Sequence, residues 1–232
     1  MKIIFSDDKI NDFKFKTKPF KHQLDAFNIS RDKEYYALFM EQGTGKSKVI
    51  VDNIAYLYRK GEINSAVIIA PKGVYRNWEQ SEIPIHMPDD VMDYSHIEIW
   101  KPVETKSNIK RLKDFLKEDT HKLKIFIINV EAFSTIKGLN YTQRFLNVHK
   151  SLVVVDESST IKHRTARRTK NILKLSKYSK FRRVLTGTPI TQSPIDIYTQ
   201  MAFLSEYVLN CSFYGFRNRY CVLRTRTINM KT

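Results

Sequence analysis

The feature that most constrains this sequence is a series of short, uninterrupted apolar runs. The two clearest are A-V-I-I-A at 66–70 and S-L-V-V-V-D at 151–156, and others cover 35–40, 96–100, 124–129 and 183–186. A strand with one face in water alternates apolar and polar residues, whereas most of these runs do not alternate. Each run therefore predicts a strand that is covered on both faces.

Segments with apolar residues at helical spacing separate these runs. They cover 49–57, 74–83, 108–117, 166–176 and 194–204. Strands that alternate with helices are typical of a parallel sheet, because each parallel connection crosses over one face of the sheet. We therefore expect one α/β domain at 18–204, with a mostly parallel sheet and helices on both faces. A leader at 1–17 precedes it, and a basic, aromatic segment at 205–232 follows it.

The composition is strongly basic, with 40 Lys and Arg against 24 Asp and Glu and a net charge of +16. A surplus of this size favours a polyanionic partner such as nucleic acid, and a solvated basic surface is the alternative. Two cysteines, Cys211 and Cys221, are too few for a disulfide framework or a zinc site. No apolar run approaches the roughly 18 residues of a membrane span, so no membrane partner is expected.

The start of the chain contains no long apolar segment of the kind that signal peptides have. The two cysteines also fit a reducing compartment. Few glycines, together with many Lys, Ile and Asn residues, are typical of an AT-rich genome. We expect a cytoplasmic protein of a bacterium or of a virus-infected host cell.

A glycine-rich loop, Gly43-Thr-Gly-Lys-Ser47, lies between a predicted strand and a predicted helix. Glycines let backbone N–H groups curl around phosphate oxygens, and the helix N-terminus adds a positive dipole. Lys46 would reach the terminal phosphates and Ser47 would ligate Mg²⁺. The full pattern has a glycine six residues before the lysine, where this chain has Met40. An ordinary glycine turn is the alternative.

Two carboxylates, Asp156 and Glu157, follow the most apolar of the predicted strands. In parallel α/β sheets ligands bind at the carboxyl edge, which is also where the glycine-rich loop is expected. Asp156 would hold Mg²⁺ through its water shell, and Glu157 would orient or deprotonate the attacking water. The alternative is a pair of helix-capping acids.

Four segments occur in a characteristic order around these motifs. They are K-P-F-K-H-Q at 18–23, I-I-A-P-K-G-V-Y-R-N-W at 68–78, D-E-S-S-T-I-K at 156–162 and L-T-G-T-P-I-T-Q at 185–192. Together they resemble the first motor lobe of superfamily 2 helicases, and within these the Swi/Snf-like DNA translocases. The resemblance covers residues 18 to about 204 and implies a RecA-like (P-loop) fold.

The resemblance also implies roles for individual residues. It places Phe20 and Gln23 at the adenine, and the loop residues Gly43, Thr44, Gly45, Lys46 and Ser47 at the triphosphate. Ser47 and Asp156 would bind the metal, and Lys46, Asp156 and Glu157 would act in hydrolysis. Thr186 and Thr188 would couple the nucleotide site to the nucleic acid, and Lys72 and Asn77 would lie on the segment that follows the DNA backbone. For Trp78, we expect simple packing of an amphipathic helix.

The chain departs from the family pattern at two points. Ser158 and Ser159 replace the usual Ala-His or Ala-Asp after the acidic pair, which questions how the site communicates with Thr186. A complete motor also needs a second lobe with an arginine finger, and the residues after 204 are too few to form one. We expect this chain to be the N-terminal part of a longer protein and its missing second lobe to act in cis.

An acid-free segment, 158–183, contains ten of the basic residues. Neutralising phosphates with such residues gives strong, salt-dependent binding. We expect Arg164, Arg167, Arg168 and Lys174 to contact nucleic acid, with Arg167, Arg168, Asn171 and Lys174 on one helical face. A solvated face is the alternative.

These observations favour an ATP-dependent DNA helicase or translocase that uses ATP and Mg²⁺. The expected partner is duplex or branched DNA, bound with little sequence preference because no base-reading motif occurs. The isolated lobe is expected to have low activity. Two alternatives stay open: the motor lobe of a restriction or remodelling enzyme, and a non-catalytic nucleic-acid-binding lobe.

Overall fold

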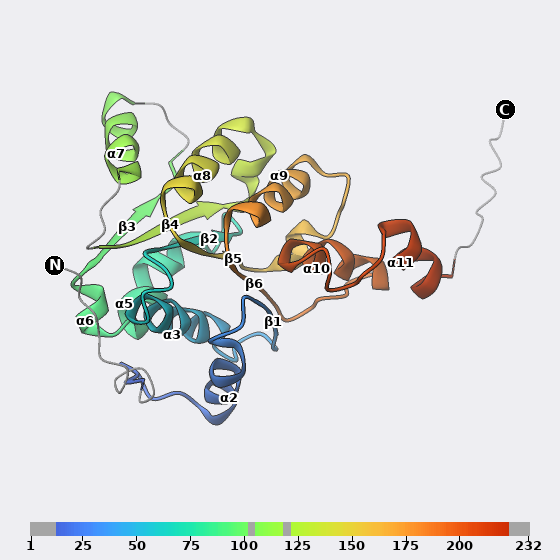
Figure 1. Cartoon of the computed structure of the whole chain (residues 1–232), viewed down its shortest axis with the longest axis horizontal. Coiled ribbons are helices and arrows are strands. Elements are labelled where there is room, and N and C mark those ends of the chain that lie inside the picture. The colour runs from blue at the N-terminus through green and yellow to red at the C-terminus, as the bar shows by residue number, and fades with distance from the viewer. Residues whose placement is uncertain (1–12, 102–104, 118–121, 223–232) are drawn as a thin grey trace.

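Six parallel strands form the centre of the protein (Figure 1). The structure is a computed structural model that describes residues 13–101, 105–117 and 122–222. The strands are β1 (Tyr35–Phe39), β2 (Ser65–Ala70), β3 (Ser95–Ile99), β4 (Leu123–Asn129), β5 (Ser151–Val155) and β6 (Phe181–Thr186). Their order in the sheet is β1-β6-β5-β2-β4-β3, and every pairing is parallel. The predicted α/β fold is confirmed.

Helices cover both faces of this sheet (Figure 1). One face carries α2 (Lys21–Ser30), α3 (Lys46–Arg59), α4 (Tyr75–Asn77), the π-helical turn η1 (Trp78–Glu82), α5 (Ile83–His86) and α6 (Asp89–Met92). The other carries α7 (Lys106–Leu116), α8 (Ile136–Val148), α9 (Arg167–Leu175) and α10 (Tyr198–Leu204). Short 3₁₀ turns lie at η2 (Val130–Ser134), η3 (Ser158–Ile161), η4 (Ser176–Tyr178) and η5 (Pro194–Ile197). Apolar spacing did not identify α2 or α8.

Alternate residues of the strands enter two separate cores. Along β2, Ala66, Ile68 and Ala70 pack with the helices of the first face, whereas Val67 and Ile69 pack with those of the second. All five side chains are fully buried. This burial explains the uninterrupted apolar runs, because neither face of the sheet has to meet water.

The segments that flank the expected lobe pack against it. Phe13 and Phe15, from the expected leader, lie against Phe27 of α2 with ring centroids 5.1 and 5.2 Å away. Residues 1–12 of the leader and 223–232 of the tail lie outside the described residues. Within the tail, α11 (Phe213–Tyr220) places the ring of Phe216 5.6 Å from that of Tyr198. Helices in the described ranges do not combine the length and apolar composition that a bilayer crossing requires.

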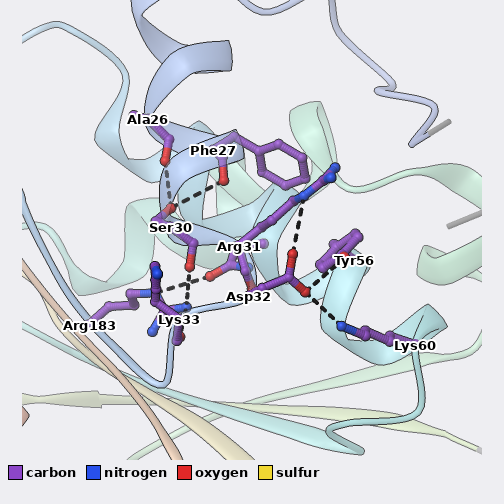
Figure 2. A network of polar contacts seen from close by, with 10 residues as sticks. Ala26, Phe27, Ser30, Arg31, Asp32, Lys33, Tyr56, Lys60 and Arg183 are labelled. Atoms are coloured by element: carbon purple, nitrogen blue, oxygen red, sulfur yellow. Dashed lines mark hydrogen bonds and ion pairs between the residues drawn. The ribbon is translucent and has the colours of Figure 1, made fainter. Parts of the chain in front are cut away.

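A buried arginine, Arg183 on β6, reaches the end of α2, where Figure 2 shows it beside Ser30 and Lys33. Its guanidinium donates to the backbone carbonyls of Ser30 (2.9 Å), Lys33 (2.8 Å) and Glu34 (3.1 Å) and to Asn53 Oδ1 on α3 (3.1 Å). Burial lowers the pKa of Arg183 to about 10, so the group stays charged at neutral pH. The end of α2, the start of β1 and the middle of α3 are therefore tied to β6.

Its neighbour Arg182 is also buried, with its guanidinium 4.3 Å from the ring centroid of Tyr35. It donates to the carbonyl oxygens of Ser176 and Ser179. The expectation that the basic surface extends to 183 is therefore wrong for Arg182 and Arg183. A strand in the middle of a sheet turns both side chains into the protein, which charge counting along the sequence does not detect.

Replacing Arg183 by Met should lower the free energy of unfolding by about 3 kcal/mol, because several buried oxygens lose their donor. Urea denaturation measures this change. The matched control is Arg167→Met on the exposed side of α9, which should stay within about 0.5 kcal/mol of the parent. Equal stability of the two variants would contradict the role given to Arg183.

Candidate active site

Three neighbouring strands deliver the motif residues to one edge of the sheet. In the register, Phe39 at the end of β1 lies beside Thr186 on β6, and Val155 at the end of β5 lies beside Val184. The glycine-rich loop and the acidic pair follow the ends of β1 and β5, and the L-T-G-T-P segment begins with the last two residues of β6. Because the strands are parallel, their carboxyl ends meet at the same edge. The sheet thus brings together motifs that lie more than a hundred residues apart.

The glycine-rich loop closes between β1 and α3. Gly43 and Gly45 have φ values of +75° and +78°, a conformation that glycine adopts without strain. Lys46 Nζ donates to the carbonyls of Met40 (3.0 Å) and Glu41 (2.9 Å). Met40, which stands where the full pattern has glycine, therefore contributes through its backbone, for which no glycine is needed.

The start of α2 is bonded to this loop. Gln23 Oε1 accepts from the backbone N–H of Phe20 (2.9 Å), and Gln23 Nε2 donates to Thr44 O (3.0 Å). Gln23 is buried, whereas 70% of Phe20 is exposed and its ring stacks on that of His22 at 5.9 Å. Phe20 is thus free to meet a ligand. Gln23 is bonded to the backbone of the glycine-rich loop through Thr44.

The first carboxylate, Asp156, is held on both oxygens. Trp78 Nε1 donates to Oδ2 (3.0 Å), and the backbone N–H of Glu157 donates to Oδ1 (2.9 Å). Burial raises the pKa of Asp156, the nearby Glu157 raises it further, and the Trp78 bond and the Lys46 charge oppose this. The Asp156 carboxylate is therefore held in one orientation, and the positive charge near it does not fully offset its negative charge.

The second carboxylate, Glu157, contacts the L-T-G-T-P segment. Its φ of 47° places it in the left-handed region, which is uncommon for a non-glycine residue. Thr186 Oγ1 donates to Glu157 Oε2 at 3.5 Å, and Thr188 N donates to Thr186 Oγ1 at 3.1 Å. The acidic pair is therefore linked to both threonines that the resemblance places in coupling.

A second route joins the acidic pair to the same segment through a residue that sequence reasoning missed. Ser158 Oγ donates to Gln200 Oε1 (2.7 Å), and Gln200 Nε2 donates to Pro189 O (2.7 Å). Both Ser158 and Gln200 are fully buried. Communication with the L-T-G-T-P segment thus has a route that begins at the unusual serine. No local signal in the sequence marked Gln200, because it lies on a separate helix.

Trp78 is a residue whose role was underestimated. Simple packing was expected, and the side chain is indeed buried, with 2% of its surface exposed. It also donates the hydrogen bond that orients Asp156. Glu82, four residues later, contacts Ser47 and was not singled out either. The N-W pair in the A-P-K-x-V-x-x-N-W string was the available signal.

The donor set fits a metal–nucleotide complex. In the part of the chain that the structure describes, no group of three or more His, Cys, Asp or Glu side chains is arranged to hold a metal. Ser47 and Asp156 supply a hydroxyl and a carboxylate, the oxygen ligands that Mg²⁺ uses together with phosphates. At Gly45 an added Cβ would lie 2.3 Å from Gln23 Nε2, so a side chain there would displace the end of Gln23 from the loop.

The basic residues of the predicted nucleic-acid surface divide into two groups. Lys72, Arg167 and Lys174 are exposed, as is the neutral Asn77, whereas Arg164 and Arg168 are half-buried. Arg164 places its guanidinium 4.3 Å from the ring centroid of Phe213 on α11. Part of the predicted surface is therefore covered by neighbouring side chains.

The expected polar face of α9 needs one correction. Asn171 is buried, and its Nδ2 donates to Phe133 O at 2.8 Å. It therefore lies on the inward face with Ile172, and the exposed basic residues of α9 are Arg167, Lys170 and Lys174. A polar side chain that satisfies a buried carbonyl is indistinguishable in sequence from one in water.

The chain belongs to the SNF2-related domain family, whose model matches residues 25–224. It is 25% identical over 228 residues to the bovine (Bos taurus) DNA annealing helicase and endonuclease ZRANB3, covering 96% of this chain and 18% of that protein. It is 27% identical over 166 residues to the chromatin-remodeling ATPase INO80 of Aspergillus clavatus, covering 71% and 9%. The chain thus spans less than a fifth of the length of these relatives.

Solved structures share the fold. The SWI2/SNF2 ATPase core of Sulfolobus solfataricus in complex with dsDNA matches with a TM-score of 0.67 at 22% identity, covering 88% of this chain and 39% of that chain. The ATPase core domain from the same organism matches with a TM-score of 0.63 at 21% identity. The expected RecA-like α/β fold is confirmed.

Replacing Gly45 by Ala should weaken binding of a fluorescent ATP analogue at least tenfold, because the new Cβ would displace Gln23 from the loop. The positive φ adds a backbone cost of about 1–2 kcal/mol. The matched control is Gly61→Ala, since Gly61 has a φ of +74° and open space around its Cβ position. This control should lose stability only, and equal nucleotide affinity in both variants would contradict the packing argument.

Proposed function

We propose that this domain is the first motor lobe of an ATP-dependent DNA translocase or helicase. The observation that carries the proposal is the contact of Thr186 with Glu157. It links the carboxylate suited to orient the attacking water to the segment that resembles a coupling motif. A lobe that had kept only the fold would have no need for this chemistry at the strand ends.

Each part of the site has a role in this proposal. The loop from Gly43 to Ser47 binds the triphosphate with its N–H groups, and Lys46 leaves the Met40 and Glu41 carbonyls to reach the terminal phosphates. Phe20 lies where it can cover the adenine. Ser47 and Asp156 would hold Mg²⁺, which would supply positive charge against the charge that develops on the phosphates. Glu157 accepts a proton from, or orients, the attacking water.

Nucleic acid is the proposed track. The supporting observations are the net charge of +16 and the exposed basic residues of α9, spaced at i, i+3 and i+7. A relative is named as a DNA annealing helicase, and a solved neighbour was determined with dsDNA. Phosphate contacts of this kind bind without reading sequence.

A second lobe completes the proposed motor. The described residues build a single sheet, and the solved neighbour is more than twice the length that matches. An arginine from another lobe or protein is worth about 10³–10⁵ in phosphoryl-transfer rate. We therefore propose that the lobe on its own binds ATP, turns it over slowly and gains little from DNA.

Two substitutions should separate binding from hydrolysis. Lys46→Ala should abolish binding of the ATP analogue, because the loop loses its side-chain charge. Glu157→Gln should retain binding and lose turnover, since it keeps the shape and removes the base. Fluorescence titration measures binding of the ATP analogue, and a phosphate-release assay measures hydrolysis. Lys174→Ala, on the exposed side of α9, is the control for charge, and parental turnover in Glu157→Gln would refute the role of Glu157.

Charge reversal on α9 should weaken DNA binding to all sequences alike. For Arg167→Glu or Lys174→Glu, the slope of log affinity against log salt should fall by about one unit per lost phosphate contact. Fluorescence anisotropy with two unrelated duplexes at several salt concentrations measures it. Lys21→Glu, on α2 at the opposite face, makes the same change in net charge. An equal loss of DNA affinity in this control would show that the effect comes from net charge and not from contacts made by α9.

A further inference from the structure

A carboxylate that the proposed mechanism does not use, Glu82, lies beside the metal side of the site. It belongs to the π-helical turn Trp78–Glu82, which interrupts the helix between α4 and α5. Side chains four residues apart lie on one side of such a helix, and π-turns are frequent at functional sites. Trp78 and Glu82 therefore face the same site: Trp78 donates to Asp156, and Glu82 lies against Ser47.

The contacts of Glu82 hold its carboxylate in place. The Ser47 side chain lies against it, and Asn77 Nδ2 donates to Oε1 at 3.3 Å. The side chain is 25% exposed, so it lies at the wall of the site. Both proposed protein ligands of the metal, Ser47 and Asp156, are thus held by residues of one π-turn.

The charge of Glu82 is poorly offset. Burial and the neighbouring Asp156 raise its pKa, which shows that the two carboxylates repel each other. His86 Nε2 lies 4.0 Å from Glu82 Oε2, but burial and the charge of Lys48 lower the pKa of His86. The imidazole is therefore neutral above neutral pH and does not compensate Glu82. A triphosphate that enters without a cation meets this negative wall.

We propose that Glu82 makes nucleotide binding depend on magnesium: it holds the Ser47 hydroxyl in position and repels a triphosphate that arrives without a divalent cation. This inference rests on the proposed ATP site and adds a selectivity to it. Glu82 acts through Ser47 and through its charge, and is a positioning residue. Asn77, the residue immediately before this π-turn, donates to Glu82, so the proposed metal selection is in contact with the segment that carries Lys72.

The test compares dissociation constants for a fluorescent ATP analogue at pH 8, with Mg²⁺ and with EDTA. Glu82→Gln keeps the shape and removes the charge. Its affinity for the metal-free analogue should rise roughly tenfold, while its affinity with Mg²⁺ stays level or falls, so that the preference for Mg²⁺ shrinks by about the same factor. A structural role alone would weaken both affinities together.

Glu79→Gln is the matched control, because Glu79 lies on the same π-turn and lines a cavity of about 190 Å³ beside Glu98 and Arg111. Its preference for Mg²⁺ should equal that of the parent. A second variant, Glu82→Asp, keeps the charge and withdraws it from Ser47. It should continue to reject the metal-free analogue and should bind the Mg²⁺ complex more weakly.

The outcomes separate this inference from the proposed function. A parent chain that binds no ATP analogue with Mg²⁺ overturns the ATP site and the inference with it. A parent that binds, together with a Glu82→Gln variant of unchanged Mg²⁺ preference, overturns the inference alone. The same shift in Glu79→Gln also overturns it, because the effect would then be one of net charge.

Discussion

The arrangement of this site depends on one constraint, the adjacency of β1, β6 and β5 in a parallel sheet. Three chain segments end at the same edge because these strands run side by side in the same direction. Lys46, Asp156 and Thr186 therefore come together because of the strand order, although they lie far apart in the sequence. The two apolar cores pack against the strands from opposite faces.

Polar side chains inside the protein then refine the edge. Arg183 ties the end of α2 and the middle of α3 to β6, and its hydrogen bonds go to backbone carbonyls and an amide. The helix that begins at Lys46 and the strand that ends at Thr186 are thus fixed relative to each other. A buried charge is costly unless it is fully hydrogen-bonded, which makes this connection demanding in geometry.

The π-turn between α4 and α5 gives the site a wall of its own. Trp78 and Glu82 reach Asp156 and Ser47, while Lys72 and Asn77 of the same stretch are exposed. One segment therefore contacts the proposed metal ligands on one side and solvent on the other. This arrangement offers a direct physical connection between the proposed nucleotide site and the surface that the resemblance places along nucleic acid.

The sequence by itself determined the parallel α/β fold, the glycine loop and the acidic pair, because each depends on local chemistry: apolar runs, positive φ and strand-end carboxylates. It did not determine the partners of those residues. Only the tertiary structure placed Gln200 on Ser158 and Trp78 on Asp156. It also turned Arg183 inward, away from the basic surface. These contacts join distant segments, and a polar residue looks the same in sequence whether it meets water or a buried partner.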